Sequence, residues 1–243
     1  GGEHISQYCL HEIVKRLEEL DADYFHNDLP NALVDTFTNV DRDLHYEPLI
    51  DPLCAGTTAC VGVLQDTKLT VANAGDSRAV GAKKKNDTGC VVTALDLTRD
   101  HNPDAPGEME RIQLHGGYVS LPPSPGLSAR VWLDETCTQI GLAMSRSIGD
   151  HMVSQLGVIS KPEITIYDTR DLEFLIFATD GVWEFIDSNQ AVQIVADSLM
   201  HHGAHVACQA LIQAAAKRWH EEEKSYRDDI TAIVVDLRNV WNH

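Results

Sequence analysis

Residues 174–181 read FLIFATDG, and the interpretation of the whole chain starts from them. Five residues suited to a buried strand, 174–178, run directly into Thr179, Asp180 and Gly181. A rigid strand that ends in a carboxylate, followed by a glycine that permits close backbone approach, is a common way to hold a hard metal ion. A strand ending in Asp-Gly is more often a plain turn, so this stretch alone does not establish a metal site.

The composition indicates a globular protein with one domain. The chain has 243 residues, enough for a sizeable core, and its 43% hydrophobic and 23% charged residues are ordinary for such proteins. No repeat or linker divides it, so we expect residues 1–243 to form a single domain. No apolar run approaches the roughly 20 residues of a membrane span, and no charged-then-apolar leader begins the chain, so we expect no membrane partner.

The net charge indicates which kinds of partner the protein binds, and the cysteines indicate the cellular compartment in which it works. A net charge of -18, from 37 acidic and 19 basic residues, argues against nucleic acid as the main partner, because phosphate backbones are bound by Lys/Arg stripes. This acidity fits a protein that concentrates cations, although acidity alone more often serves solubility. The six cysteines show no CxxC spacing, so we expect reduced thiols in the cytoplasm or the nucleus. We also expect a monomer.

The hydrophobic pattern predicts runs of strands separated by runs of helices. Such an order favours an α+β fold with antiparallel sheets over a doubly wound parallel sheet. We expect strands 57–95 to form an antiparallel meander and strand 164–168 to pair with 173–178. The predicted helices are 5–20, 29–44, 104–115, 188–200 and 204–219, and the predicted strands are 57–64, 69–74, 78–82, 90–95, 140–145, 164–168, 173–178 and 230–237.

Four acidic residues fall at predicted strand ends or turns: Asp76, Asp180, Glu184 and Asp228. Carboxylates gathered at one end of a sheet repel one another unless a divalent cation offsets their charge. Ligands that are all oxygen favour Mg²⁺ or Mn²⁺ over zinc. The alternative interpretation is four unrelated turn acids, which residue spacing by itself does not exclude.

Seven blocks of sequence carry a more specific signal. They are AGTTA (55–59), VANAGDSRAV (71–80), LTRDHNP (97–103), ERI with GGYV (110–112 and 116–119), LAMSRSIGD (142–150), ATDGVWE (178–184) and DDITAIVV (228–235). In this order they resemble the metal-dependent protein serine/threonine phosphatases of type 2C. One block would be a weak signal, whereas seven in the family's order, spread over most of the chain, make the resemblance specific.

The resemblance implies a fold, a reaction and a cofactor. The fold is a four-layer α-β-β-α sandwich of two antiparallel sheets flanked by helix pairs, with a metal site at one end. The reaction is hydrolysis of phosphoserine or phosphothreonine in a phosphoprotein substrate by a metal-activated water, without a phosphoenzyme. The cofactor is two Mn²⁺ or Mg²⁺ ions, with a third ion bound more weakly.

The resemblance also implies roles for individual residues. Asp180 and Asp228 match the family's metal-ligand positions, and Asp76 and Glu184 match positions that help to hold the third ion. The family usually has Asp where this chain has Glu184, which has a longer reach. Asp229 stands where the family usually has Asn and adds a negative charge beside the site.

The chain departs from the family at its start. Family members carry an Asp-Gly-His-Gly-Gly motif and a preceding Arg, which supply the bridging carboxylate, the general acid and the phosphate contact. This chain begins at what resemble the two closing glycines of that motif, Gly1 and Gly2. We therefore expect the family's N-terminal strands to be missing from these 243 residues, and we identify no catalytic residue in this sequence.

Two explanations compete for this departure. In the first, the natural protein has a segment before Gly1 and is an enzyme. In the second, the protein is a catalytically inactive phosphatase-like adaptor or regulatory binding protein. The presence of Asp76, Asp180 and Asp228 together favours the enzyme.

Overall fold

The structure is a computed structural model that describes residues 2–84, 92–124, 127–238 and 240. Its contacts divide the chain into two compact units, each assembled from separated segments. Unit 1 comprises Gly1–Val61, Ala72–Asp76 and Asp100–Ile164, and unit 2 comprises Gly62–Val71, Ser77–Arg99 and Thr165–His243. The prediction of a single domain stays a prediction.

The helices and strands alternate in runs, as the sequence pattern predicts. The helices are α1 (Glu3–Glu19), α2 (Ala22–Asn27), α3 (Leu29–Leu44), α4 (Glu108–Leu114), α5 (His151–Ser154), α6 (Asp180–Trp183) and α7 (Ser188–Glu223). The strands are β1 (Gly56–Thr57), β2 (Ala59–Gln65), β3 (Lys68–Ala74), β4 (Arg78–Lys84), β5 (Val92–Asp96), β6 (Tyr118–Ser120), β7 (Arg130–Trp132), β8 (Ile148–Gly149), β9 (Glu163–Asp168), β10 (Leu172–Ala178) and β11 (Ala232–Asp236).

Antiparallel sheets with packed helices confirm the predicted α+β class. The sheets have the orders β11-β10-β4-β5, β2-β3-β9, β1-β8 and β6-β7. The registers described for β10 with β11, β10 with β4, β4 with β5, β1 with β8 and β6 with β7 are all antiparallel. No helix in the part of the chain that the structure describes is long and apolar enough to span a membrane.

Two long helices of unit 1 follow their apolar periodicity. The predicted helix 29–44 is confirmed as α3, and its buried residues Leu33, Phe37, Val40 and Leu44 recur at the spacing of one helix face. Helix α1 buries Ile5, Cys9 and Ile13 in the same way. Helix α2 was not predicted, although the side chain of Asp21 caps it by accepting from the backbone N–H groups of Asp23 and Tyr24.

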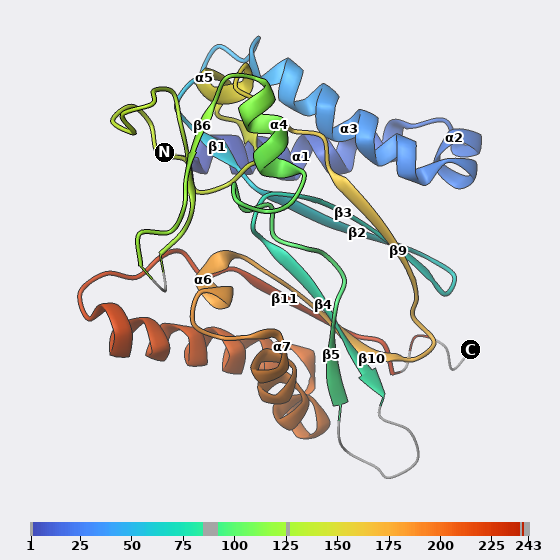
Figure 1. Cartoon of the computed structure of the whole chain (residues 1–243). Helices are drawn as coiled ribbons and strands as arrows, with labels where there is room; N and C mark the ends of the chain where they lie inside the picture. Colours follow the sequence, from blue (N-terminus) through green and yellow to red (C-terminus); the bar gives the residue numbers. More distant parts are fainter. Residues whose placement is uncertain (1, 85–91, 125–126, 239, 241–243) are drawn as a thin grey trace. The chain divides into compact units, whose positions relative to one another are not determined.

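The main sheet of unit 2 is centred on the strand with which the sequence analysis began. Strand β10 lies between β4 and β11, so that Ile176 is opposite both Val80 and Val234 (Figure 1). Helix α7 packs against this sheet and buries Val192, Val195 and other apolar side chains in one cluster with Phe174 and Ile176. This burial makes β10 a rigid platform for the residues that follow it.

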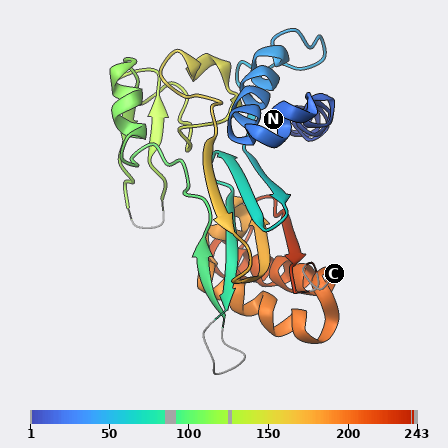
Figure 2. The ribbon, with the colours of Figure 1, turned by 90° about the vertical axis from the view of Figure 1, so that its right-hand side faces the viewer.

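Helix α7 consists of two arms that meet at Gly203. The backbone of Gly203 has φ 79° and ψ 173°, a conformation that is essentially restricted to glycine. The two predicted helices, 188–200 and 204–219, are therefore confirmed, and the second extends to Glu223 (Figure 2).

The predicted antiparallel meander over residues 57–95 is wrong. Strands β2 and β3 belong to one sheet, whereas β4 and β5 belong to another. The chain changes sheets at Gly75, whose φ of 118° redirects the backbone between β3 and β4. Cys90 of the predicted strand 90–95 lies outside the described residues, as do Gly1 and residues 85–87.

The predicted pairing of 164–168 with 173–178 is also wrong. Strand β9 joins β2 and β3, while β10 pairs with β4 and β11. The fully buried Thr169 donates its backbone N–H and its hydroxyl to the carbonyl of Thr67. These bonds fix a turn that takes the chain from one sheet to the other, instead of the hairpin that the sequence suggested.

Two shorter predictions need correction in unit 1. Helix α4 begins at Glu108 rather than at 104, because Pro106 disfavours helix in the preceding residue and Gly107 has φ 84°. The predicted strand 140–145 is an irregular segment with one bridge, between Leu142 and Val131. The backbone N–H of Ser145 is directed to the carbonyl of His101 instead of to a neighbouring strand.

Candidate metal-binding site

Asp180 begins helix α6 immediately after β10. The preceding Thr179 is extended, with φ -81° and ψ 167°, so the chain leaves the strand and enters the helix at the Asp180 residue. Helix α6 ends after four residues, and the backbone N–H of Glu184 donates to the carbonyl of Asp180. The end of one buried strand thus presents two carboxylates, one helical turn apart.

The segment that carries Asp228 is bonded to this strand end. The backbone N–H of Thr179 donates to the carbonyl of Thr231 over 3.1 Å, and the N–H of Thr231 donates to the Thr179 hydroxyl over 3.2 Å. That hydroxyl in turn donates to the carbonyl of Asp229 over 3.3 Å. Three bonds between residues 179 and 229–231 bring Asp228 to the region of Asp180.

Gly181 makes this approach possible. A β-carbon at this position would lie 2.2 Å from the carbonyl oxygen of Asp229, a distance that no side chain tolerates. The glycine following Asp180 is therefore required by close backbone packing rather than by a left-handed turn, since its φ is not positive. The glycine after Asp180, which in the sequence suggests a turn, is therefore needed for close packing of two backbone segments.

The charges of the acidic residues interact. Burial raises the pKa of Glu184, and the negative charges of Asp180, Glu223 and Asp228 raise it further. The contribution of these three charges means that the ionised carboxylates repel one another. The structure therefore brings together three of the four residues predicted from the sequence: Asp180, Glu184 and Asp228.

Asp76, the fourth predicted residue, belongs to unit 1, whereas the other three belong to unit 2. It follows β3 in the turn that begins with Gly75. The assignment of Asp76, Asp180, Glu184 and Asp228 as metal ligands stays a prediction.

Sequence reasoning missed two residues of this region, Glu223 and Tyr226. Glu223 is the last residue of α7, and its negative charge contributes to the raised pKa of Glu184. The charge of Asp228, burial and a hydrogen bond with the Asp228 side chain raise the pKa of Tyr226. The sequence held one signal for Tyr226, its position two residues before Asp228.

Aromatic residues fix the strand end and the helix that follows it. Trp183 is buried and donates from Nε1 to the carbonyl of Ala178, as expected for a core residue beneath the site. Trp219 donates from Nε1 to the carbonyl of Gly181 over 2.7 Å. The Trp219 ring also packs edge-to-face against Phe185 and Tyr226, so it joins α7, α6 and the Asp228 segment.

The donor set suits a hard divalent cation in its chemistry. All the candidate ligands are carboxylates, and the repulsion that raises the pKa of Glu184 is the kind that a cation relieves. In the arrangement described, however, no group of three or more His, Cys, Asp or Glu side chains among the described residues is positioned to hold an ion.

The residues match a known family along most of the chain. The family model described as "Protein phosphatase 2C" matches residues 1–223. The chain is 35% identical over 219 residues to "Probable protein phosphatase 2C 75" of Oryza sativa subsp. japonica, covering 89% of this chain and 49% of that relative. It is 37% identical over 210 residues to "Probable protein phosphatase 2C 41" of Arabidopsis thaliana, covering 85% of this chain and 58% of that relative.

Solved structures share the fold. A serine-threonine phosphatase 2C from Toxoplasma gondii superposes with a TM-score of 0.73 at 24% identity, covering 96% of this chain and 76% of that one. A C. elegans sex determining protein gives the same TM-score at 17% identity, covering 98% of this chain and 55% of that one. The chain spans about half the length of the curated relatives it matches.

Proposed function

Because this chain belongs to the protein phosphatase 2C family, we propose that it acts in the metal-dependent hydrolysis of phosphoserine and phosphothreonine in phosphoproteins. The observation that supports the proposal most is the placement of Asp180, Glu184 and Asp228 around the end of β10, where burial raises the pKa of Glu184 and the charges of Asp180, Glu223 and Asp228 raise it further. Mutual repulsion of this kind destabilises an empty site and favours one that holds a cation.

The residues of unit 2 would divide the work of holding the ions. Asp180 and Asp228 would bind them directly, and Glu184, with its longer side chain, would bind directly or through water. When bound, Mn²⁺ or Mg²⁺ supplies positive charge that polarises a water for attack on phosphorus. Asp76 would contribute to a third ion.

Three residues would orient these carboxylates. The charge of Asp228 raises the pKa of Tyr226, so the protonated Tyr226 hydroxyl would donate to the Asp228 carboxylate and restrict its rotation. Gly181 and Thr179 hold the Asp228 segment against the end of β10. Both effects lower the conformational entropy that ion binding has to remove.

The test is Mn²⁺-dependent hydrolysis of a phosphothreonine peptide by the chain and by Asp180→Asn. We expect activity that requires the metal and falls in the variant by more than the roughly 10- to 100-fold loss typical of an outer-shell partner. The control is Asp197→Asn, which removes the same charge from an exposed position of α7 in the same unit. Its activity should equal that of the unaltered chain.

Failure of this test has a defined meaning. If neither the chain nor a longer form of the protein that includes an Asp-Gly-His segment hydrolyses the peptide, the enzyme is excluded and the adaptor or binding protein remains. Equal activity in Asp180→Asn and the unaltered chain would exclude the proposed role of Asp180.

A further inference from the structure

The turn that carries Asp76 has an unusually constrained backbone. Gly75 has φ 118°, and a β-carbon on it would lie 2.3 Å from the Thr58 side chain. The direction in which Asp76 leaves β3 is therefore set by the conformation of the Gly75 peptide groups. A contact that fixes the backbone of Gly75 therefore also fixes the direction in which the Asp76 side chain leaves the turn.

His101 holds Gly75 at both of its polar backbone groups. The His101 side chain is fully buried, and its Nδ1 atom lies 3.1 Å from both the backbone nitrogen and the carbonyl oxygen of Gly75. The backbone N–H of His101 donates to the Gly75 carbonyl over 3.1 Å, and Asn73 Nδ2 donates to the same carbonyl over 3.1 Å. Since this carbonyl already accepts two bonds, the pattern assigns Nδ1 as the acceptor of the Gly75 N–H.

This tautomer places the ring proton on the other nitrogen. Nε2 of His101 lies 3.6 Å from Oε2 of Glu163, so its N–H faces a carboxylate. A buried ring whose two nitrogens face a backbone N–H and a carboxylate is oriented in one way only. An apolar residue of similar size could fill the space but could not hold the Gly75 peptide.

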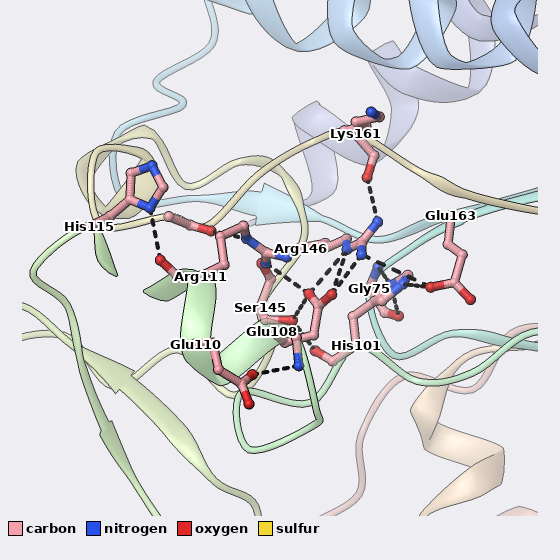
Figure 3. Close-up of polar contacts among 12 residues, drawn as sticks. Gly75, His101, Glu108, Glu110, Arg111, His115, Ser145, Arg146, Lys161 and Glu163 are labelled. Atoms are coloured by element: carbon pink, nitrogen blue, oxygen red, sulfur yellow. Dashed lines mark hydrogen bonds and ion pairs between the residues drawn. The ribbon is translucent and has the colours of Figure 1, made fainter. Parts of the chain in front are cut away.

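A buried ion network holds His101 in turn. The backbone N–H of Ser145 donates to the carbonyl of His101 over 2.8 Å, and the Ser145 hydroxyl oxygen lies 2.9 Å from the same carbonyl (Figure 3). The hydroxyl proton of Ser145 is directed to Oε2 of Glu108, 2.5 Å away, and Glu108 is 1% exposed. Arg146 and Arg111 bind the Glu108 carboxylate at 2.6 Å and 2.8 Å. Figure 3 shows these side chains meeting at Glu108, with His101 between them and Gly75.

We propose that His101 is a positioning residue for Asp76: it fixes the Gly75 peptide so that the Asp76 carboxylate is held ready for a divalent cation. The Glu108–Arg146 pair and Ser145 keep His101 in place. This inference rests on the proposed metal-dependent function. A preoriented ligand loses less conformational entropy on binding, and loss of an outer-shell partner typically weakens metal binding about 10- to 100-fold.

The test measures Mn²⁺ binding directly, by electron paramagnetic resonance of the free ion during titration of the chain. The variant Asp76→Ala defines the component of binding that depends on Asp76. We expect His101→Leu to weaken that component by about tenfold or more. We expect His101→Asn to restore it, because an Asn oxygen can take the place of Nδ1 and accept from the Gly75 N–H.

Two controls separate positioning from general stability. His101→Gln keeps a polar side chain but places its polar atoms near the Nε2 position, so it should bind as weakly as His101→Leu. Val153→Ala removes apolar volume from the cluster that contains Ile112, Val131 and Val158 of the same unit. It should lower the Tm without changing Mn²⁺ affinity.

A metal-free measurement addresses the same contact. Amide hydrogen exchange at Gly75, followed by NMR, should be slow in the unaltered chain and in His101→Asn, and faster in His101→Gln. If His101→Leu does not fold, the comparison of His101→Asn with His101→Gln still decides the result.

The inference is overturned if His101→Gln binds Mn²⁺ like the unaltered chain, if Gly75 exchange is unchanged in it, or if Val153→Ala weakens binding equally. It is also overturned if the unaltered chain shows no component of Mn²⁺ binding that depends on Asp76. Failure of the proposed function is distinguishable, because a chain that binds Mn²⁺ as expected but does not hydrolyse the peptide retains the role of His101.

Discussion

At the scale of single residues, Glu108 shows how a buried charge is kept ionised. Burial on its own raises the pKa of this carboxyl, but hydrogen bonds from Arg146, Arg111 and Ser145 outweigh burial and hold the pKa below its usual range. The pairing is what makes a 1% exposed glutamate compatible with a folded core. Removing the Glu108 carboxylate would take from Arg111 and Arg146 the ion pair that each makes with it.

We predict that Glu108→Gln lowers the free energy of unfolding by about 3–5 kcal/mol near pH 7, the usual effect of breaking a buried ion pair. The pKa of Glu108 is lower in the folded state than the ordinary value of 4.5, so the stabilisation that ionised Glu108 provides is present above pH 4.5. It is lost as the pH falls through 4.5 toward the folded-state pKa. The difference between variant and unaltered chain should therefore shrink in acid.

Urea unfolding of both proteins at pH 7 and pH 3 measures this difference. Glu110→Gln is the matched control, since Glu110 lies on the same helix and bonds to the N–H of Gly107, a bond that Gln also makes. A gap between Glu108→Gln and the unaltered chain that is as wide at pH 3 as at pH 7 would contradict the argument.

The candidate site could be predicted in part from residue types. Asp180, Glu184 and Asp228 were found because acids at strand ends and turns are visible in the sequence, and the structure brings these three together. Tyr226 and His101 could not be found in this way. A tyrosine beside a carboxylate and a histidine on a backbone amide leave no pattern of spacing, because their partners are chosen by the fold.

At the scale of elements, the segment before β11 can pack against the end of β10 only because residue 181 is a glycine and has no side chain. Gly181→Ala places a methyl group against the carbonyl of Asp229, which is backbone and cannot rotate away. We predict that this variant separates the Asp180 and Asp228 segments, lowers the Tm, and abolishes Mn²⁺ binding at the carboxylates of unit 2. Calorimetry and Mn²⁺ titration measure the two effects.

Gly203→Ala is the control for that prediction. A β-carbon at Gly203 meets nothing within 4 Å, so its cost of about 1–3 kcal/mol comes only from the φ of 79°. It should lower the Tm and leave Mn²⁺ binding unchanged. Loss of Mn²⁺ binding in Gly203→Ala as well would show that Gly181→Ala acts through general instability.

Helices were easier to predict than strand partners for a physical reason. The apolar period of α3 is a local property, so its bounds from 29 to 44 follow from the sequence. The choice of sheet for β4 or β10 depends on turns at Gly75 and Thr169 that redirect the chain. A turn residue signals that the chain bends, and carries no information about which sheet it then joins.

At the scale of the whole molecule, the net charge of -18 acts on stability as well as on partners. Like charges repel across the folded surface, and salt screens them with a Debye length of about 8 Å at 0.15 M. We predict that the Tm of the chain rises between low salt and 0.15 M NaCl. We also predict that MgCl₂ at the same ionic strength raises it further, because the proposed site in unit 2 would bind Mg²⁺.

Differential scanning calorimetry in matched NaCl and MgCl₂ series measures both effects. Asp180→Asn should respond to NaCl like the unaltered chain and should respond less to MgCl₂. A Tm that falls or stays constant with NaCl would show that the acidic residues are too dispersed for their repulsion to matter.

The family was predictable at this scale because seven short blocks retain their order along 243 residues, and the family model matches residues 1–223. The α+β class followed from the runs of strands and helices. The ligand set stays a prediction, because chain order does not encode the distances between the carboxylates of separate segments.

The place of β10 in the main sheet also has a consequence for how the protein is synthesised. The two strands that flank β10 lie on either side of it in the sequence. Ile176 pairs with Val80, which is translated earlier, and with Val234, which is translated later. A ribosome therefore releases the β4–β5 hairpin with one edge unpaired, and later β10 with an edge that only β11 covers. Because β11 is translated after β10, that edge of β10 stays unpaired until residues 232–236 have been synthesised.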